Sequence, residues 1–323
     1  MTEMNIYDAV VVGLGNIGAQ FFDRKKNHPF NHSEALRQHL QIRLIGGYDL
    51  SHEKRQFFET NYQVSAYSSL NKLLELKPAL VSICSPASMH FKQVMACLDA
   101  GVKLIWLEKP PVETSAELKS IQLKAQTCGA KVLVNYQRRY CANYQAVRDL
   151  FSNGRLGAPI TAHVLYSRGL ELNGSHMLDI LFFISSDMGD VHLDTVSAMS
   201  GVENPSFTFS TNGFPVSVGG LNLPYHCVEI VLYFEKGRAT IRYSGLDSLV
   251  DVVVENEYAA GYYRLEDGND LFSIPPADMT CIFPMVAIND LIGAFEEGRE
   301  AQSSLTTAMQ TQGLIQLVRG RLK

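Results

Sequence analysis

Two stretches of the sequence carry residues whose types and spacing could do chemistry, and the first is a glycine-rich turn. Gly13, Gly15 and Gly18 form the pattern GxGxxG directly after an uninterrupted apolar run. In such a turn the first glycine permits a tight bend, the second lets the backbone approach a pyrophosphate, and the third permits close packing of a helix against a strand. The helix N-terminus offers free N–H groups and a favourable dipole to the anion. We therefore expect this turn, including Asn16 and Ile17, to bind a dinucleotide.

The second stretch is IWLEKPPV, residues 105–112, where a charged pair is followed at once by two prolines. Pro110 and Pro111 remove two backbone donors and restrict the residue before each of them. Lys109 is therefore expected to be held in an extended or turn geometry at the end of a buried strand, where its ammonium group can be aimed at a ligand. A solvated lysine beside a proline turn is the alternative.

An acidic residue at the end of the second strand is expected to accept hydrogen bonds from the adenosine ribose, and Asp49 is the candidate. It lies 31 residues after Gly18, further than the roughly 20 that the pattern predicts. The stretch KKNHPFNHSEALRQHL supplies the excess as an extra helical or loop segment. Because a carboxylate there would repel a 2′-phosphate, NAD is favoured over NADP. A solvated turn aspartate is the alternative.

The stretch SICSPASMH places small residues and a proline where another strand ends and a helix begins, which in an open sheet is the edge of the ligand crevice. Ser85 and Pro86 are expected to border the nicotinamide ribose. His90 either joins them at the cofactor or sits on a helix face for structural reasons, and the structural role is the preferred one.

A third set of polar residues lies in LELNGSHMLDILFF, where Asn173 or Ser175 can cap a helix. His176, Asp179 and Phe183 would then share one helix face by their spacing. A histidine with an ordinary pKa of about 6.5 is mostly neutral at pH 7, whereas a lysine with a pKa of about 10.4 is mostly charged. We therefore expect His176 to accept a hydroxyl proton while the lysine of EKPP polarises the oxygen.

The remaining candidates are predicted to contact the substrate or the cofactor, and they are Tyr136, Arg139, Asn173 and Asp179. A diphosphate on a nucleotide-linked sugar would suit the fork of an arginine. Arg139 could equally hold two domains together, and the sequence leaves both roles open.

Five short apolar runs separated by helix-like stretches must position these residues. They predict a doubly wound parallel sheet in a Rossmann domain over residues 1–138. The runs are YDAVVVG, QIRLIGGYD, ALVSICSP, VKLIWLEKP and AKVLVNYQ, with helices expected at 68–77, 87–100 and 113–128.

The hydrophobic pattern of the sequence changes after residue 138. Segments in which apolar and polar residues alternate predict an antiparallel open sheet with helices on one face. This second α/β domain, 139–323, is assigned to substrate binding and oligomerisation. Helices are expected at 141–152, 175–185, 284–297 and 304–320, the last of which can pack back on the first domain.

Composition narrows the class of protein. The 323 residues are 46% hydrophobic and carry a net charge of −5 without a long basic cluster, so a nucleic-acid partner is not expected. No apolar run approaches the roughly 20 residues of a membrane span, and the histidines and cysteines lack metal-ligand spacing. The six cysteines show no CxxC pattern and several lie in apolar segments. We expect buried, reduced thiols and a cytoplasmic protein.

The order of motifs along the chain resembles the glucose-fructose oxidoreductase, inositol dehydrogenase and MocA family. The motifs are GLGNIG, CSP with His90, AGVKLIWLEKPP, VNYQRRY with Arg139, GRLGAPI and NGSHMLDILFF, and they cover nearly the whole chain. The resemblance implies a Rossmann domain followed by an α/β domain whose open sheet face mediates assembly into a dimer or tetramer. It also implies NAD(P)-dependent oxidation or reduction of a sugar or cyclitol hydroxyl. NHSEAL and YSRGLELNGSHMLD are similar to a subgroup associated with surface-polysaccharide and nucleotide-sugar pathways.

The resemblance also assigns residue roles. Glu108 and Lys109 match the family's EKP motif, whose lysine points toward the nicotinamide and the reacting carbon of the substrate, so both residues are expected to contact the cofactor. The family usually has an aspartate four residues before the histidine, and this chain has Leu172 there with Glu171 beside it. We therefore expect an NAD-dependent oxidoreductase acting on a sugar, cyclitol or nucleotide sugar. The departure at Leu172 keeps open a sensor of cofactor or sugar without turnover, and aldehyde or imine reduction is a third possibility.

Overall fold

The computed structural model describes residues 5–22, 28–185, 189–211, 214–243, 246–275 and 284–322. The chain forms two compact units, one comprising Met1–Gln137 with Ile282–Met309 and the other Arg138–Cys281 with Gln310–Lys323. The sequence assigned everything after residue 138 to a second domain, whereas residues 282–309 group with the first unit.

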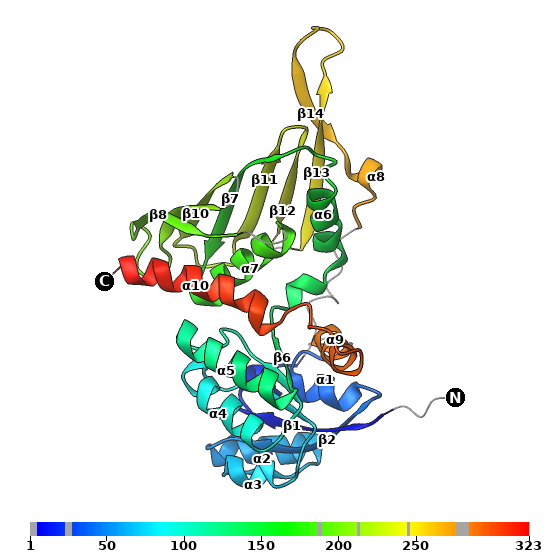
Figure 1. Ribbon diagram of the computed structural model, residues 1–323, viewed down its shortest axis with the longest axis vertical. Coiled ribbons are helices and arrows are strands. Elements are labelled where there is room, and N and C mark those ends of the chain that lie inside the picture. The colour runs from blue at the N-terminus through cyan, green and yellow to red at the C-terminus, as the bar shows by residue number, and fades with distance from the viewer. Residues whose placement is uncertain are drawn as a thin grey trace. The chain divides into compact units, whose positions relative to one another are not determined.

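The first unit is built on a parallel sheet, which over the described residues has six strands in the order β3-β2-β1-β4-β5-β6 (Figure 1). The strands are β1 (Tyr7–Val12), β2 (Ile42–Tyr48), β3 (Ala66–Tyr67), β4 (Leu80–Ile83), β5 (Leu104–Leu107) and β6 (Lys131–Val134). The order reverses between β1 and β4, which is the point where open sheets form a ligand crevice. The predicted doubly wound sheet is confirmed, and β3 is the strand that the sequence did not predict.

Helices cover both faces of this sheet because its strands are apolar on both faces. They are α1 (His32–Gln38), α2 (His52–Tyr62), α3 (Leu70–Leu74), α4 (Ala87–Asp99), α5 (Ser115–Cys128) and α9 (Met285–Glu296). Side chains of Asn31, Ser51 and Thr114 accept N–H groups at the starts of α1, α2 and α5, so each begins at a polar cap. Val81 and Ile83 belong to the core that α3, α4 and α5 cover, and Ser82 between them points to the opposite face.

The chain after the glycine turn departs from the expected long helix. It forms η1 (Asn16–Gln20), a five-residue π-helix, and α1 begins only at His32. The extra segment between the turn and Asp49 is therefore helical in its second part. Residues 23–27 within it lie outside the described residues.

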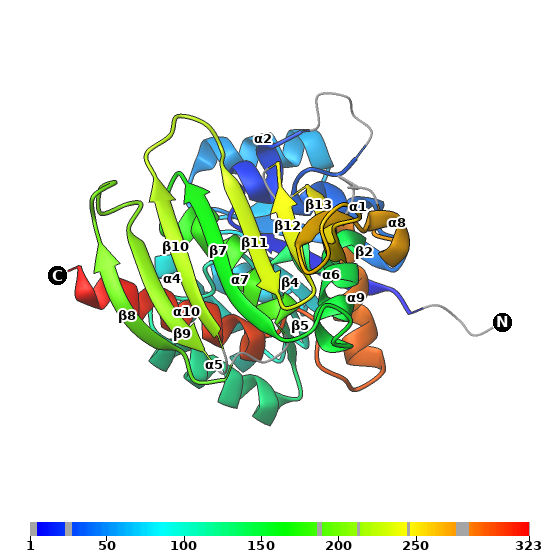
Figure 2. The ribbon, with the colours of Figure 1, turned by 90° about the horizontal axis from the view of Figure 1, so that it is seen from above.

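The second unit has a mixed sheet, which over its described residues comprises eight strands in the order β14-β13-β12-β11-β7-β10-β9-β8. Figure 2 looks onto this sheet, whose neighbours are antiparallel except for the parallel pair β7 and β10. The strands are β7 (Pro159–Ser167), β8 (His192–Ser197), β9 (Ser206–Thr211), β10 (Phe214–Leu221), β11 (Val228–Phe234), β12 (Gly237–Arg242), β13 (Asp247–Glu255) and β14 (Tyr263–Asp267). Burial alternates along β9 to β12, as expected for a sheet with one covered face. The predicted α/β domain with a largely antiparallel sheet is confirmed.

Short helices and the C-terminal helix complete the second unit. They are α6 (Ala142–Ser152), η3 (Leu170–Gly174), α7 (Ser175–Ile184) and α8 (Asn269–Phe272), together with the 3-10 turn η2 (Gln137–Tyr140) and α10 (Leu305–Arg321), which both cross the division between the units. Helices α6 and α7 contact each other and pack on β13 and β11, respectively. Among the described residues, no helix is both long enough and apolar enough to cross a membrane.

The cysteines depart in part from the expectation of reduced thiols. Cys84, Cys97, Cys128 and Cys227 are free, and burial raises the pKa of the Cys97 thiol to about 12. Cys141 is disulfide-bonded, so the prediction is wrong at this position. The prediction for Cys281 lies outside the described residues.

Candidate functional site

A cavity of about 390 Å³ lies at the carboxyl ends of β1, β2 and β4, where the strand order reverses. Its size is within the range of small-molecule sites in proteins. Five residues predicted to bind the cofactor line it, namely Gly13, Gly15, Asp49, Ser85 and Pro86, together with Tyr48, Leu50, Lys54, Cys84, Met89 and Gln93.

The three glycines of the turn meet the requirements that the sequence pattern sets for a dinucleotide. Gly13 has a positive φ of 91°, and a Cβ there would lie 2.6 Å from the backbone nitrogen of Ser85. A Cβ on Gly18 would lie 2.0 Å from the carbonyl oxygen of Gly13, so the turn closes tightly on itself. A Cβ on Gly15 would meet its nearest neighbour, Lys54 Nζ, only at 3.7 Å. The backbone at Gly15 therefore faces space that a pyrophosphate could enter.

Asp49 joins the glycine turn to the start of α2. One carboxylate oxygen accepts the backbone N–H of Leu14 at 2.9 Å, and the other accepts that of Ser51 at 2.9 Å. Lys54 Nζ lies 3.7 Å from the first oxygen, and its side chain is 44% exposed. The carboxylate is thus part of the cavity wall and has a cation beside it. Each oxygen retains a further lone pair for a ribose hydroxyl.

Ser85 and His90 link the cavity to the prolines of the EKPP motif. The Ser85 hydroxyl donates to Gln93 at 2.5 Å. His90 is buried, with Nε2 2.7 Å from the carbonyl oxygen of Ser85 and Nδ1 3.0 and 3.2 Å from those of Pro110 and Pro111. Burial lowers the pKa of His90. These contacts describe the structural role that the sequence preferred for His90, and its ring does not line the cavity.

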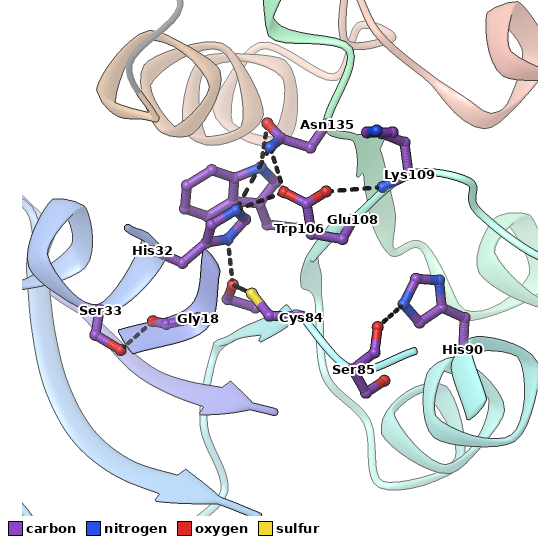
Figure 3. Close-up of polar contacts among 11 residues, drawn as sticks. Gly18, His32, Ser33, Cys84, Ser85, His90, Trp106, Glu108, Lys109 and Asn135 are labelled. Carbon is purple, nitrogen blue, oxygen red and sulfur yellow. Dashed lines mark hydrogen bonds and ion pairs between the residues drawn. The ribbon is translucent and has the colours of Figure 1, made fainter. Parts of the chain in front are cut away.

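Glu108 is the centre of a buried hydrogen-bond network, which Figure 3 draws. Its Oε1 accepts from His32 Nε2 at 2.9 Å and from Asn135 Nδ2 at 2.6 Å, and its Oε2 accepts the backbone N–H of Lys109 at 3.1 Å. Burial by itself raises the pKa of Glu108, but hydrogen bonds from His32 and Asn135 and nearby positive charge outweigh it, and the net pKa is lowered. The carboxylate therefore binds other protein groups, and its contact with the cofactor stays a prediction.

Lys109 follows the last residue of β5 by two positions and lies at a bend, in accordance with the restriction that the prolines impose. Its side chain is half-buried, and the Lys109–Pro110 peptide bond is cis. The network around Glu108 holds its backbone nitrogen. The backbone position of the lysine is thus held by Glu108 after β5, which in turn binds Asn135 after β6 and His32 of α1.

Helix α7 begins differently from the sequence prediction. Neither Asn173 nor Ser175 caps it, because the preceding turn is the π-helix η3 and the Ser175 hydroxyl donates to the carbonyl of Glu171 at 2.7 Å. Asn173 donates to the carbonyl of Ser167 at 2.8 Å. His176 is half-buried in the first turn of α7. The Glu171 carboxylate pairs with Arg319 at 2.5 Å. Leu172, and not Glu171, occupies the sequence position of the family's aspartate.

Arg139 and Asp179 form a buried ion pair within the second unit. Arg139 Nε and Nη2 donate to the two carboxylate oxygens at 2.8 and 2.7 Å. The two side chains are 4% and 1% exposed. Burial raises the pKa of Asp179, and the charge and hydrogen bonds of Arg139 offset this only in part. The pair links η2 to α7, and the contact of these two residues with the substrate stays a prediction.

Tyr136 is also buried, with 0% of its surface exposed, and it belongs to the core that includes Val134. The contact of Tyr136 with the substrate stays a prediction. Among the described residues, no group of three or more histidines, cysteines, aspartates and glutamates could hold a metal ion.

Comparison with known proteins relates this geometry to a family. Residues 7–136 match the GFO_IDH_MocA model, described as an oxidoreductase family with an NAD-binding Rossmann fold. Residues 7–136 therefore resemble the NAD-binding Rossmann domain of this family. The matched residues contain the glycine turn, the cavity and the EKPP motif, so the resemblance seen in the sequence is confirmed.

Two relatives of the chain are named as dehydrogenases of a glucoside and of inositol. D-glucoside 3-dehydrogenase of Escherichia coli (strain K12) is 32% identical over 131 residues, 35% of this chain and 37% of that protein. Inositol 2-dehydrogenase of Rhodococcus erythropolis is 25% identical over 213 residues, 60% of this chain and 59% of that protein. The chain thus spans less than two thirds of the length of either relative.

The fold is shared with solved structures over the whole chain. The WlbA dehydrogenase from Bordetella pertussis, solved in complex with NADH and UDP-GlcNAcA, has a TM-score of 0.79 at 17% identity and covers 98% of this chain and 96% of its own. At this identity the likeness concerns the fold.

Three residues of the site were not predicted from the sequence. Lys54 lines the cavity, and its signal was its place just after the acidic end of the second strand. His32 and Asn135 bind Glu108, although nothing near them in the sequence indicates it. The long spacing between Gly18 and Asp49 indicated only that an extra segment, which contains His32, is present.

Proposed function

We propose that the protein is an NAD-dependent oxidoreductase that transfers a hydride between nicotinamide and a hydroxyl or keto carbon of a sugar, cyclitol or nucleotide sugar. The observation that carries this proposal is the cavity at the sheet's reversal point, where Gly15 leaves room for a pyrophosphate. The match of residues 7–136 to the family model supports it, as do the substrates that the names of the relatives state.

We propose NAD rather than NADP as the cofactor. The residues proposed to hold it are those of the glycine turn together with Asp49, Ser85 and Pro86. Of these, Gly13, Gly15, Asp49, Ser85 and Pro86 line the cavity, whereas Asn16, Ile17 and Gly18 do not. The Asp49 carboxylate would repel a 2′-phosphate. The ammonium group of Lys54, 3.7 Å from the same carboxylate, offsets part of this repulsion. A bound nicotinamide would supply the acceptor or donor of the hydride.

The roles proposed for the chain's own residues concern the proton. In the direction of oxidation, His176 takes the proton of the substrate hydroxyl and Lys109 stabilises the developing alkoxide. The hydride leaves the carbon that bears this hydroxyl and would pass to the nicotinamide. In the direction of reduction both transfers reverse. Asn173 is proposed to contact the substrate. We keep the proposal of a cofactor-binding domain over residues 1–138 and a substrate-binding domain over 139–323.

We further propose a cytoplasmic homo-oligomer, a dimer or tetramer, whose partner is a small-molecule sugar or nucleotide sugar and not nucleic acid or membrane. The disulfide at Cys141 is the feature that argues against a reducing compartment. Fractionation of the native host and light scattering of the purified protein would test compartment and assembly, respectively.

The test of the proposed function is turnover. The purified protein is mixed with NAD⁺ or NADH and a panel of sugars, cyclitols and nucleotide sugars, and the absorbance of reduced nicotinamide is followed. Lys109→Ala is expected to abolish turnover on the substrate found while the Kd of NAD stays within about threefold, because the lysine acts on the transition state. Lys103→Ala, at the exposed start of β5, is the matched control.

Two results would contradict this proposal. Cofactor binding without turnover on any substrate would favour a sensor of the same fold. Full turnover in Lys109→Ala would remove the role of the lysine and leave that of the cofactor site intact.

A further inference from the structure

The extra segment between Gly18 and Asp49 contains three fully buried polar residues, Asn31, His32 and Ser33, and the side chain of His32 reaches Ser82 and Glu108. His32, at the first position of α1, is 0% exposed. Its ring stacks on Trp106 with centroids 3.6 Å apart and planes inclined by 20°. Its two nitrogens lie 2.7 Å from Ser82 Oγ and 2.9 Å from Glu108 Oε1. The ring thus contacts β4, β5 and the residue that follows β5.

The hydrogen-bond roles of this ring are constrained by its partners. A carboxylate only accepts, so Nε2 of His32 carries a proton and donates it to Glu108. The second carboxylate oxygen accepts the backbone N–H of Lys109 at 3.1 Å. A continuous link therefore runs from the imidazole through one carboxylate to the backbone of the lysine, as Figure 3 shows.

The link is held laterally as well. Asn135 donates to the same Oε1 at 2.6 Å and accepts from Trp106 Nε1 at 3.1 Å. Glu108 can rotate only if these bonds break, and a buried network that is fully satisfied is rigid. The imidazole is therefore tied to the residue directly before Lys109 and, through it, to the Lys109 backbone.

We propose that His32 is a positioning residue of the reaction: it fixes the Glu108 carboxylate and, through it, the backbone from which the Lys109 side chain reaches the substrate oxygen. This inference rests on the proposed function. It also gives the extra segment between Gly18 and Asp49 a task, which is to supply the imidazole. A misplacement of about 1 Å at a catalytic group can cost about 100-fold in rate.

Two polar substitutions that differ only in reach separate this role from simple core filling. In His32→Gln the amide nitrogen stands at the Nε2 position and can still donate to Glu108. In His32→Asn it stands at the Nδ1 position, so it can reach Ser82 and not Glu108. Both replacement side chains are neutral and lack the ring that stacks on Trp106, so both variants lose this packing. His39→Asn is the control, because His39 follows the same helix and binds Asn289 at 2.8 Å.

Three quantities are measured for each variant: kcat, the Kd of NADH, and the hydrogen-exchange rate of the Lys109 amide by NMR. His32→Asn is expected to lower kcat about 10- to 100-fold, with the Kd of NADH within about threefold and a faster Lys109 amide exchange. His32→Gln is expected to stay within about fivefold of the original kcat with a protected amide. His39→Asn is expected to match the unmodified protein in all three.

Several outcomes would overturn the proposal. Equal losses in the Asn and Gln variants would assign His32 to packing alone. A loss of NADH affinity as large as the loss of kcat would mean that the cofactor cavity is distorted. An unmodified protein without turnover would refute the proposed function and, with it, any role in a reaction. The exchange rates would then still show whether His32 holds the backbone of Lys109.

Discussion

Among the described residues, each unit contains one buried carboxylate, and the two are held in different ways. Over the described residues, Glu108 receives hydrogen bonds from an imidazole, an amide and a backbone N–H that come from separate parts of the chain. Asp179 receives both of its described bonds from the single guanidinium of Arg139. The net pKa is lowered for Glu108 and raised for Asp179.

The difference shows what overcomes the cost of burying a carboxylate. Desolvation disfavours the ionised form in both places, and hydrogen bonds to the charged form oppose it. Donors from three directions are sufficient at Glu108, whereas one bidentate partner is not sufficient at Asp179. A network of this kind also fixes its members relative to one another, and Lys109 is one of those members.

The largest expected effect on the free energy of unfolding comes from breaking the Arg139–Asp179 ion pair. Arg139→Ala leaves Asp179 buried without its partner and is expected to lower the free energy of unfolding by about 3–5 kcal/mol. Because the pKa of this carboxylate is already raised and would rise further, the deficit should grow as the pH rises from acid to neutral. Urea unfolding at several pH values measures it.

The matched control replaces both partners at once. Arg139→Met with Asp179→Leu removes the pair without stranding a charge, and most of the lost stability should return. If the double variant is as unstable as Arg139→Ala, the pair contributes more than its own charges require.

The second effect concerns Glu108, whose pKa is shifted in the opposite direction, although the loss of stability again grows as the pH rises. Glu108→Gln removes the charge that the donors stabilise and is expected to cost about 1–3 kcal/mol at neutral pH. A carboxylate with a lowered pKa contributes stability above its unfolded value and loses it as the pH falls through the folded value. The difference between the two proteins should therefore close as the pH falls below 4.5, the ordinary value for this carboxyl.

Urea unfolding from pH 7 to pH 3 checks this, with Glu113→Gln, on the exposed loop before α5, as the control for a general loss of charge. A gap that is the same at every pH would mean that Glu108 is protonated throughout, and the contrast with Asp179 would disappear.

The sequence predicted the framework of both carboxylates better than their partners. Apolar runs located β1, β2, β4, β5 and β6, because continuous hydrophobic segments between helical patterns have few other interpretations. The two-residue β3 was missed, since a strand of that length has no periodicity to detect. The glycine spacing predicted the turn and the cavity wall, because backbone geometry there excludes a Cβ.

The partners could not be predicted because they are distant in the sequence. His32 and Glu108 are separated by 76 residues and Arg139 and Asp179 by 40, and no local pattern records such a contact. The start of α7 was predicted wrongly for a local reason. The Ser175 hydroxyl has two available partners, the helix N–H groups and the carbonyl of Glu171, and it binds the latter.

The smallest effect concerns a third carboxylate, Asp49, whose cationic neighbour Lys54 is exposed to solvent. Lys54→Ala should change the free energy of unfolding by less than about 1 kcal/mol, as is usual for exposed pairs. It should nevertheless alter cofactor preference, because Asp49 would then face the cavity without a compensating charge. We expect the affinity for NADPH to fall about three- to tenfold and that for NADH to stay within about twofold.

Energy transfer from Trp106, the one tryptophan of the chain, to the reduced cofactors measures both affinities, and Lys72→Ala, on the exposed face of α3, is the control. The difference between the cofactors should shrink in high salt, because exposed charges are screened. If both affinities fell equally, Lys54 would bind a phosphate that NADH and NADPH share, and Asp49 alone would not determine the preference for NAD. The exposed pair would then act on ligand binding, whereas the two buried carboxylates act on stability and position.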